Sequence, residues 1–351
     1  MPTPSSLADS FGRSIRDLRI SITDRCNFRC LYCLPETEEA ANFYRGRFNP
    51  DKAKPINYSW KPRDHFLTYE EIERLVRILA RLGVNKIRLT GGEPLLRRNV
   101  SNLVSRLAGV PGIDDIALTT NGFLFPDQAA GLHQAGLRRV TFSIDSLDPA
   151  NFKKITGRDG LHLVKESIRV AKDLGFAPIK LNAVVIRHLN DHELVELARF
   201  AQIEKVAMRF IEFMPLDSSR AWQRDHVVGK AEILERVGSA MRLSPIRDEN
   251  ESTTAQRWMI EDGPAEIGVI APVTEPFCGH CNRIRLTADG QIRTCLFSLG
   301  EHDIKESLRG GADDQAVIAR LQAIIAQKEE RHHIGEADFA QPDRTMSYIG
   351  G

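Results

Sequence analysis

The six cysteines of the chain constrain its fold most, because they form two groups of three that lie far apart in the sequence. The first cysteine triad is Cys26, Cys30 and Cys33, and the second is Cys278, Cys281 and Cys295. No cysteine is left over. In a reducing compartment, grouped cysteines indicate metal sites before disulfides. The fold must therefore build two thiol sites from distant parts of one chain.

The bulk composition is that of an ordinary globular protein, with 42% hydrophobic and 27% charged residues in a chain of 351. The formal net charge of +1 gives no general attraction to nucleic acid or to acidic membranes. No stretch approaches the roughly 18 apolar residues of a membrane span. The opening MPTPSSLADSFGRS has no signal-peptide core. We expect a cytoplasmic protein without a nucleic-acid or membrane partner.

An alternation of strand-like and helix-like segments fills the first two thirds of the chain. Thr68 and Glu71 predict a capping box at the start of a helix that ends at Gly83. Strands are expected near 15–24, 86–90, 115–120, 139–144, 179–186 and 206–211, and further helices near 98–108, 126–136, 161–174 and 191–203. Six strands alternating with five helices predict an α/β fold, an incomplete (βα)6 TIM-like barrel with its active-site loops at the strand C-termini.

The pattern changes after about residue 245. Strand candidates near 257–261, 266–271, 283–287 and 291–296 surround the second cysteine triad, and a helix near 313–329 precedes a polar tail. We therefore predict a partial barrel over 1–245 and a smaller C-terminal domain over 246–351. Residues 36–66 show no clean period and are predicted to be a loop.

The first cysteine triad, Cys26-x3-Cys30-x2-Cys33, comes directly after the first predicted strand. A 4Fe-4S cluster has four irons, so three thiolates leave one iron open to a small molecule. Structural zinc normally takes four ligands, which makes zinc, or unligated thiols, the weaker alternative. The turn Gly91-Gly92-Glu93-Pro94 follows the second strand and taken alone indicates only a turn.

Together, DRCNFRCLYC and the downstream GGEP resemble the radical S-adenosylmethionine (SAM) superfamily. The resemblance implies a 4Fe-4S cluster on the first triad, with SAM bound to its open iron. One-electron reduction then cleaves SAM to methionine and a 5′-deoxyadenosyl radical. By position, Tyr32 would contact the adenine, and Gly92 would offer backbone to the methionine amino group.

The second triad, Cys278-x2-Cys281-x13-Cys295, is also one thiolate short of a closed site, and a Cys3His zinc site that uses His280 is the alternative. The segment PFCGHCNRIRLTADGQIRTCLF, the first-triad motifs and the terminal Gly350-Gly351 together resemble the GTP 3′,8-cyclase (MoaA-type) family over nearly the whole chain. This family begins molybdenum cofactor synthesis. The resemblance implies a second 4Fe-4S cluster whose open iron binds the guanine of GTP, and a product that is 3′,8-cyclo-7,8-dihydro-GTP.

A triphosphate brings roughly four negative charges, which converging Arg and Lys side chains must meet. Alternation along a strand puts Lys86 and Arg88 on one face, and Arg283 and Arg285 on one face of another strand. Any one cation alone is more typical of a solvated surface. The candidates match the family pattern as a group: Arg19, Lys86, Arg88, Lys180, Arg209, Arg283 and Arg285. The sequence contains no P-loop motif.

The remaining assignments depend on the resemblance alone. It implies that Thr119 contacts GTP, that Ser143 and Met214 contact SAM, and that the tail enters the active site. The implied catalytic set is Arg19, Arg209, Gly350 and Gly351. Implied partners are GTP, a one-electron reductant protein and the cyclic pyranopterin monophosphate synthase that receives the product, and a homodimer is compatible with the family. A radical SAM enzyme that modifies peptides is the alternative enzyme, and an electron carrier or zinc scaffold is the non-catalytic one.

Overall fold

The computed structural model describes residues 6–37, 56–58, 60–217, 220, 222–247, 251–261 and 263–350. Six strands lie side by side in chain order and are all parallel: β1 (Asp17–Ser21), β2 (Lys86–Thr90), β3 (Asp115–Thr120), β4 (Arg139–Ser143), β5 (Ile179–Val185) and β6 (Ala207–Glu212). The predicted α/β partial barrel is confirmed. Its buried apolar residues form one main core that includes side chains from these strands and from the helices.

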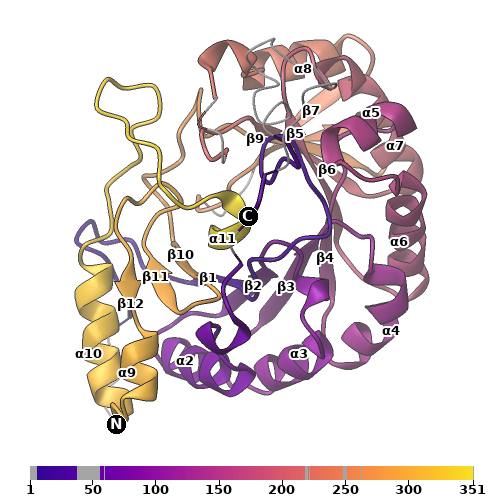
Figure 1. The fold of residues 1–351 in the computed structure, drawn as a ribbon. Coiled ribbons are helices and arrows are strands. Elements are labelled where there is room, and N and C mark those ends of the chain that lie inside the picture. The colour runs from indigo at the N-terminus through magenta and orange to yellow at the C-terminus, as the bar shows by residue number, and fades with distance from the viewer. Residues whose placement is uncertain are drawn as a thin grey trace.

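Helices connect the strands and surround the curved sheet on its outside (Figure 1). They are α2 (Tyr69–Arg81), α3 (Val100–Ala108), α4 (Phe125–Gln134), α6 (Leu161–Asp173) and α7 (Leu194–Glu204). The predicted capping box is present, since the Glu71 amide donates to Thr68 Oγ1 at 3.2 Å and the Thr68 amide to Glu71 Oε2 at 2.7 Å. Two helices of the barrel region, α5 (Pro149–Thr156) and α8 (Lys230–Gly238), were not predicted.

The C-terminal region extends both edges of the barrel sheet. Strand β9 (Glu266–Ile270) pairs parallel to β6, and β10 (Arg283–Leu286) pairs parallel to β1. Antiparallel strands β8 (Gln256–Ile260) and β7 (Leu243–Ile246) follow β9, and β11 (Gln291–Arg293) and β12 (His302–Asp303) follow β10. The sheet therefore contains eight neighbouring parallel strands, two of them C-terminal. The predicted boundary at residue 245 stays a prediction.

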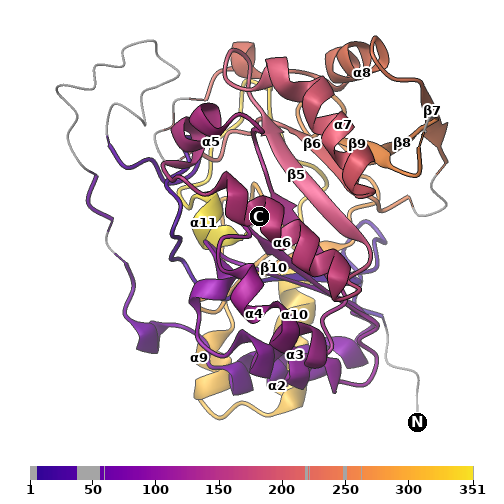
Figure 2. The ribbon, with the colours of Figure 1, turned by 90° about the vertical axis from the view of Figure 1, so that its right-hand side faces the viewer.

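Three helices complete the C-terminal region: α9 (Lys305–Arg309), α10 (Asp314–Ile325) and α11 (Met346–Ile349). Helices α9 and α10 lie beside α2 in both ribbon views, whereas α11 and the C-terminal end lie inside the arc of strands (Figures 1 and 2). In the predicted loop 36–66, a 3-10 turn forms at Arg63–His65, and residues 38–55 and 59 lie outside the described residues. Among the described helices, none combines the length and apolar character needed to cross a bilayer.

Candidate active site

A cavity of about 360 Å³ lies within the curved sheet and is lined by residues of both cysteine triads. Most of the predicted site residues line it: all six cysteines, Arg19, Tyr32, Arg88, Gly92, Thr119, Ser143, Lys180, Arg209, Met214, Arg283 and Arg285. Gly350 touches this set, because its carbonyl accepts a hydrogen bond from Arg285. Gly351 lies outside the described residues. Lys86 does not line the cavity. The fold thus brings together residues that are more than half the sequence apart.

The loop of the first triad lies directly against the GGEP turn. The amide of Gly92 donates to the carbonyl of Thr23 at 2.8 Å, and the amide of Glu93 donates to that of Arg25 at 2.7 Å. Within the triad loop, the Cys33 amide donates to the Cys30 carbonyl at 2.9 Å. These backbone contacts set the position of the triad relative to the turn.

The thiols of the first triad are enclosed. Burial raises the pKa of Cys26 to about 11 and that of Cys33 to about 12, so neither thiol ionises without a metal to replace the proton. In neither triad do all three Sγ atoms lie within 4.8 Å of one another. Tetrahedral zinc with Zn–S bonds of about 2.3 Å needs sulfurs roughly 4 Å apart. The three sulfurs of each triad, as they lie in this structure, are therefore spaced too widely to bind one tetrahedral zinc ion together.

The second triad comes from two loops of the C-terminal region. Cys278 and Cys281 precede β10, and Cys295 follows β11. Although burial alone would raise the pKa of Cys281, the nearby Arg283 and Lys328 more than offset it and lower that pKa to about 7. His280 faces Glu251 at 3.1 Å with 63% of its side chain exposed, and it does not line the cavity. This orientation argues against the Cys3His zinc alternative.

Three arginines lie in one row across neighbouring strands. Arg19 on β1 is in register with Arg285 on β10 and with Arg88 on β2. Because adjacent strands are about 4.8 Å apart, these side chains of like charge leave the sheet close together. We call Arg285, Arg19 and Arg88 the arginine row.

The cavity cations carry more positive charge than the groups around them neutralise. Burial, and then the neighbouring arginines, lowers the pKa of Lys180 to about 8. Burial likewise lowers the pKa of Arg19 to about 10, with Arg88 and Arg283 acting in the same direction, and Arg19 Nε has no hydrogen-bond partner among the described residues. Arg209 does pair with Glu266. Buried like charges are costly without a counter-ion, so this arrangement indicates an anionic ligand.

Lys86 lies two residues before Arg88 on β2, in register with Asp17 on one side and Asp115 on the other. Two residues along a strand correspond to roughly 6.6 Å. The shared strand face was predicted from alternation, but position along the strand decides which of the two side chains reaches the cavity.

Two carboxylates in or beside this site, those of Asp145 and Glu93, were not predicted from the sequence. Asp145 lines the cavity and accepts the Tyr32 hydroxyl at 2.6 Å and the Val184 amide at 2.8 Å. Glu93 is fully buried and accepts the Asn121 amide at 2.7 Å, and burial raises its pKa to about 7. Glu93 belongs to the GGEP turn, and Asp145 follows the implied SAM contact Ser143 by two residues. Only these positions in the sequence could have pointed to them.

The end of the chain lies over the cavity. Met346 and Ser347 of α11 line it, and the Gly350 carbonyl accepts a hydrogen bond from Arg285 of the arginine row. Gly350 has a φ of 81°, and a Cβ added there would lie 3.0 Å from Ser21 Cβ. Only glycine suits this conformation and this close approach.

Known proteins resemble the chain over its whole length. Residues 20–201 match the Radical SAM superfamily, and residues 206–334 match Molybdenum Cofactor Synthesis C. A GTP 3′,8-cyclase of Rhodopirellula baltica is 45% identical over 355 residues, covering 100% of this chain and 94% of the relative. A GTP 3′,8-cyclase of Mycolicibacterium smegmatis is 42% identical and covers 100% and 93%.

A solved structure shares the fold. Streptococcus suis SuiB bound to S-adenosylmethionine superposes with a TM-score of 0.59 at 16% identity, covering 89% of this chain and 68% of SuiB.

Proposed function

Since the chain belongs to the GTP 3′,8-cyclase family of radical SAM enzymes, we propose that its cavity is where SAM and GTP meet, between two 4Fe-4S clusters. The reaction is the cyclisation of GTP in molybdenum cofactor biosynthesis. The observation that carries the proposed location is the cavity itself, which both cysteine triads and the arginine row line together.

The first triad would hold the cluster that binds SAM, and Tyr32, Gly92, Ser143 and Met214 would contact SAM. The backbone pairing of the GGEP turn with residues 23–25 supports this, because it holds the turn beside the triad. When bound, SAM and the first cluster supply the carbon radical that removes a ribose hydrogen, and the second cluster supplies an open iron for guanine. The Tyr32–Asp145 hydrogen bond would fix the tyrosine ring against the adenine.

The cavity cations would bind the triphosphate. The arginine row, Lys180, Arg209 and Arg283 would neutralise its charge, and Thr119 would act beside them because it accepts a hydrogen bond from Arg88 at 3.1 Å. Gly268 leaves the space that Arg209 fills, since a Cβ there would lie 2.8 Å from Arg209 Cδ. Lys86 does not line the cavity, so it would add to the positive charge around the triphosphate without contacting it.

The remaining roles belong to the tail and to other proteins. Gly350 and Gly351 would enter the site beside Arg19, where glycine lets the backbone approach the ligand and helps to exclude water. A one-electron reductant protein would supply electrons, and the product would pass to the cyclic pyranopterin monophosphate synthase. Six free cysteines suit a cytoplasmic setting, in which thiols stay reduced. A homodimer remains a prediction.

An anaerobic assay of reconstituted protein with SAM, reductant and GTP, followed by mass spectrometry, tests the proposal. We expect GTP-dependent 5′-deoxyadenosine together with a nucleotide of GTP mass plus two hydrogens. Deoxyadenosine without any change in GTP would reject GTP as the substrate and favour a peptide. Zinc without sulfide in the purified protein would reject both enzyme hypotheses, the GTP cyclase and the radical SAM enzyme that modifies peptides.

Lys328 is expected to raise the reduction potential of the second cluster. Its side chain donates to the carbonyls of Arg283 and Thr294, it is 3% exposed, and it has no carboxylate partner in the described part of the chain. Burial raises the pKa of Cys278 and of Cys295, and Lys328 opposes that rise at both. The buried ammonium therefore favours negative charge at this site, including the extra electron of a reduced cluster.

We predict that Lys328→Met makes reduction of the second cluster roughly tenfold less favourable, which is a potential about 59 mV more negative for one electron. A redox titration followed by electron paramagnetic resonance measures this. Lys328→Arg keeps the charge and is the matched control, and the first cluster is the internal reference. Equal potentials in the Met and Arg variants would contradict the prediction.

A further inference from the structure

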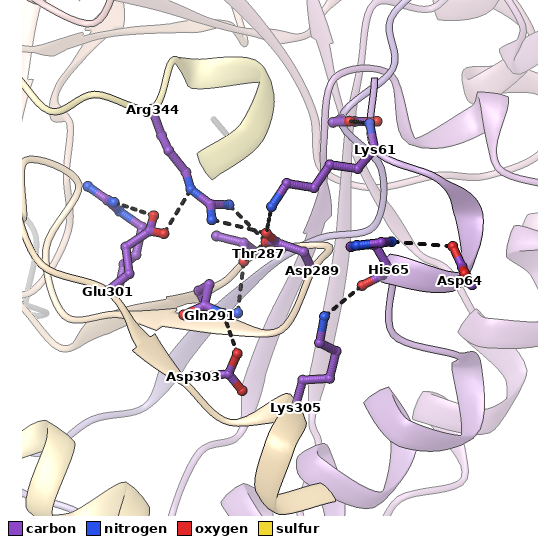
Figure 3. A network of polar contacts seen from close by, with 12 residues as sticks. Lys61, Asp64, His65, Thr287, Asp289, Gln291, Glu301, Asp303, Lys305 and Arg344 are labelled. Atoms are coloured by element: carbon purple, nitrogen blue, oxygen red, sulfur yellow. Dashed lines mark hydrogen bonds and ion pairs between the residues drawn. The ribbon is translucent and has the colours of Figure 1, made fainter. Parts of the chain in front are cut away.

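A buried carboxylate on the hairpin β10–β11 binds the C-terminal tail (Figure 3). Asp289 lies in the turn of this hairpin with 5% of its surface exposed. Arg344 of the tail donates from Nη1 to Asp289 Oδ1 at 2.8 Å and from Nη2 to Oδ2 at 3.0 Å. Lys61 and Thr287 bind the same carboxylate at 2.5 and 2.6 Å. Asp289 therefore joins three separate segments of the chain.

Arg344 has a second acidic partner, since its Nε lies 2.8 Å from Glu301 Oε2. Two-pronged pairing of arginine with a carboxylate is among the stronger polar contacts and also fixes direction. Burial would raise the pKa of Asp289, but Arg344, Lys61 and Thr287 more than offset it and hold that pKa well below its usual range. Asp289 is therefore ionised at every pH at which an enzyme of this kind works.

The β10–β11 hairpin contacts the tail at two points, at Arg344 and at Gly350. Arg285 on β10 donates to the Gly350 carbonyl, and Asp289 in the turn after β10 holds Arg344. Between these two points α11 turns inward, and Ile349 is fully buried. Fixing Arg344 on Asp289 therefore limits where Gly350 can lie.

We propose that Asp289 and Arg344 form a latch that holds the C-terminal tail over the active site, which makes both of them positioning residues for the cyclisation. The inference rests on the proposed function, in which the tail acts inside the cavity. Neither residue lines the cavity, so each acts through the tail.

The tail offers a matched control one residue away. Asp343 pairs with Arg220, but their side chains are 96% and 60% exposed. Exposed ion pairs contribute little to stability, whereas breaking a buried, two-pronged ion pair costs more. Asp343→Asn thus removes a tail carboxylate without touching the latch.

The latch is tested by hydrogen–deuterium exchange of the reconstituted protein, without turnover. The amides of Tyr348, Ile349 and Gly350 donate within the tail, at 3.0, 3.2 and 2.8 Å. We expect Arg344→Gln and Asp289→Asn to speed their exchange at least tenfold, and Asp343→Asn to leave it unchanged. Because both substitutions break the shared Asp289–Arg344 contact, the effect of the double variant should be smaller than the sum of the two single effects. Arg344→Lys should restore part of the protection.

The same variants are then assayed for turnover. We expect kcat for cyclisation to fall at least tenfold in Arg344→Gln, with a smaller change in KM for GTP. Exchange as slow as in the wild type would overturn the latch. Fast exchange with full cyclisation would show that holding the tail does not matter for the reaction, which overturns the positioning role. A wild-type protein that makes no cyclised nucleotide would instead refute the proposed function and leave the exchange result standing.

Discussion

Replacing Cys295 by serine is expected to reduce GTP cyclisation by more than about a hundredfold, since even the outer partners of metal ligands cost 10–100-fold. Cleavage of SAM should largely persist. The reason is the separation of the two cysteine triads. The first lies on the loop after β1 and against the GGEP turn, whereas Cys295 lies after β11 on the C-terminal side of the cavity.

The measurement compares deoxyadenosine with cyclised nucleotide in one anaerobic reaction. Cys33→Ser is the matched control, because loss of a first-triad ligand should abolish both products. Iron content distinguishes a lost cluster from a lost reaction. Equal loss of deoxyadenosine and cyclised nucleotide in Cys295→Ser would contradict separate roles for the two triads.

The barrel could be predicted because its signals are local. The strand Lys86–Thr90 follows a capped helix that ends before Gly83, and the same arrangement of strand, helix and turn recurs along the chain. The pairing of β10 with β1 has no such local signal. It joins segments far apart in the sequence, and long-range pairing depends on which sheet edges the rest of the fold leaves open.

The site divides in a similar way. Residue type and spacing were enough to propose the cysteines, because thiolate clusters need those groups. The cavity cations were proposed as a group because they match the pattern of the GTP 3′,8-cyclase family, and residue type, spacing and strand alternation supported the set. They did not distinguish Arg88 from Lys86, since alternation fixes a face and not a height along the strand. Nor could they find the pairing of Asp289 with Arg344. Asp289 lies within the segment around the second triad, but Arg344 belongs to no motif and only the fold brings the two together.

Replacing Gly92 by alanine is the substitution for which the backbone leaves least room. A Cβ at this position would lie 2.6 Å from the carbonyl carbon of Arg25 and 2.9 Å from the carbonyl oxygen of Asp24. Both neighbours are backbone, so no side-chain rotation can relieve the clash. Overpacking typically costs about 1–3 kcal/mol, and we expect a value near the upper end. The loop that must move leads directly into Cys26.

Gly131→Ala is the matched control, because Gly131 lies within α4 and a Cβ there meets nothing within 4 Å. Alanine in a helix interior is favoured over glycine by roughly 0.5–1 kcal/mol, so this variant should become more stable. Chemical denaturation should therefore give opposite signs for the two variants.

Gly92→Ala should also lose SAM cleavage by about a hundredfold, which corresponds to about 3 kcal/mol at the transition state. If Gly92→Ala instead cleaves SAM at the wild-type rate, the close approach of residue 92 to the Cys26 loop is not what SAM binding requires. The backbone pairing of GGEP with residues 23–25 would then serve the stability of the barrel alone.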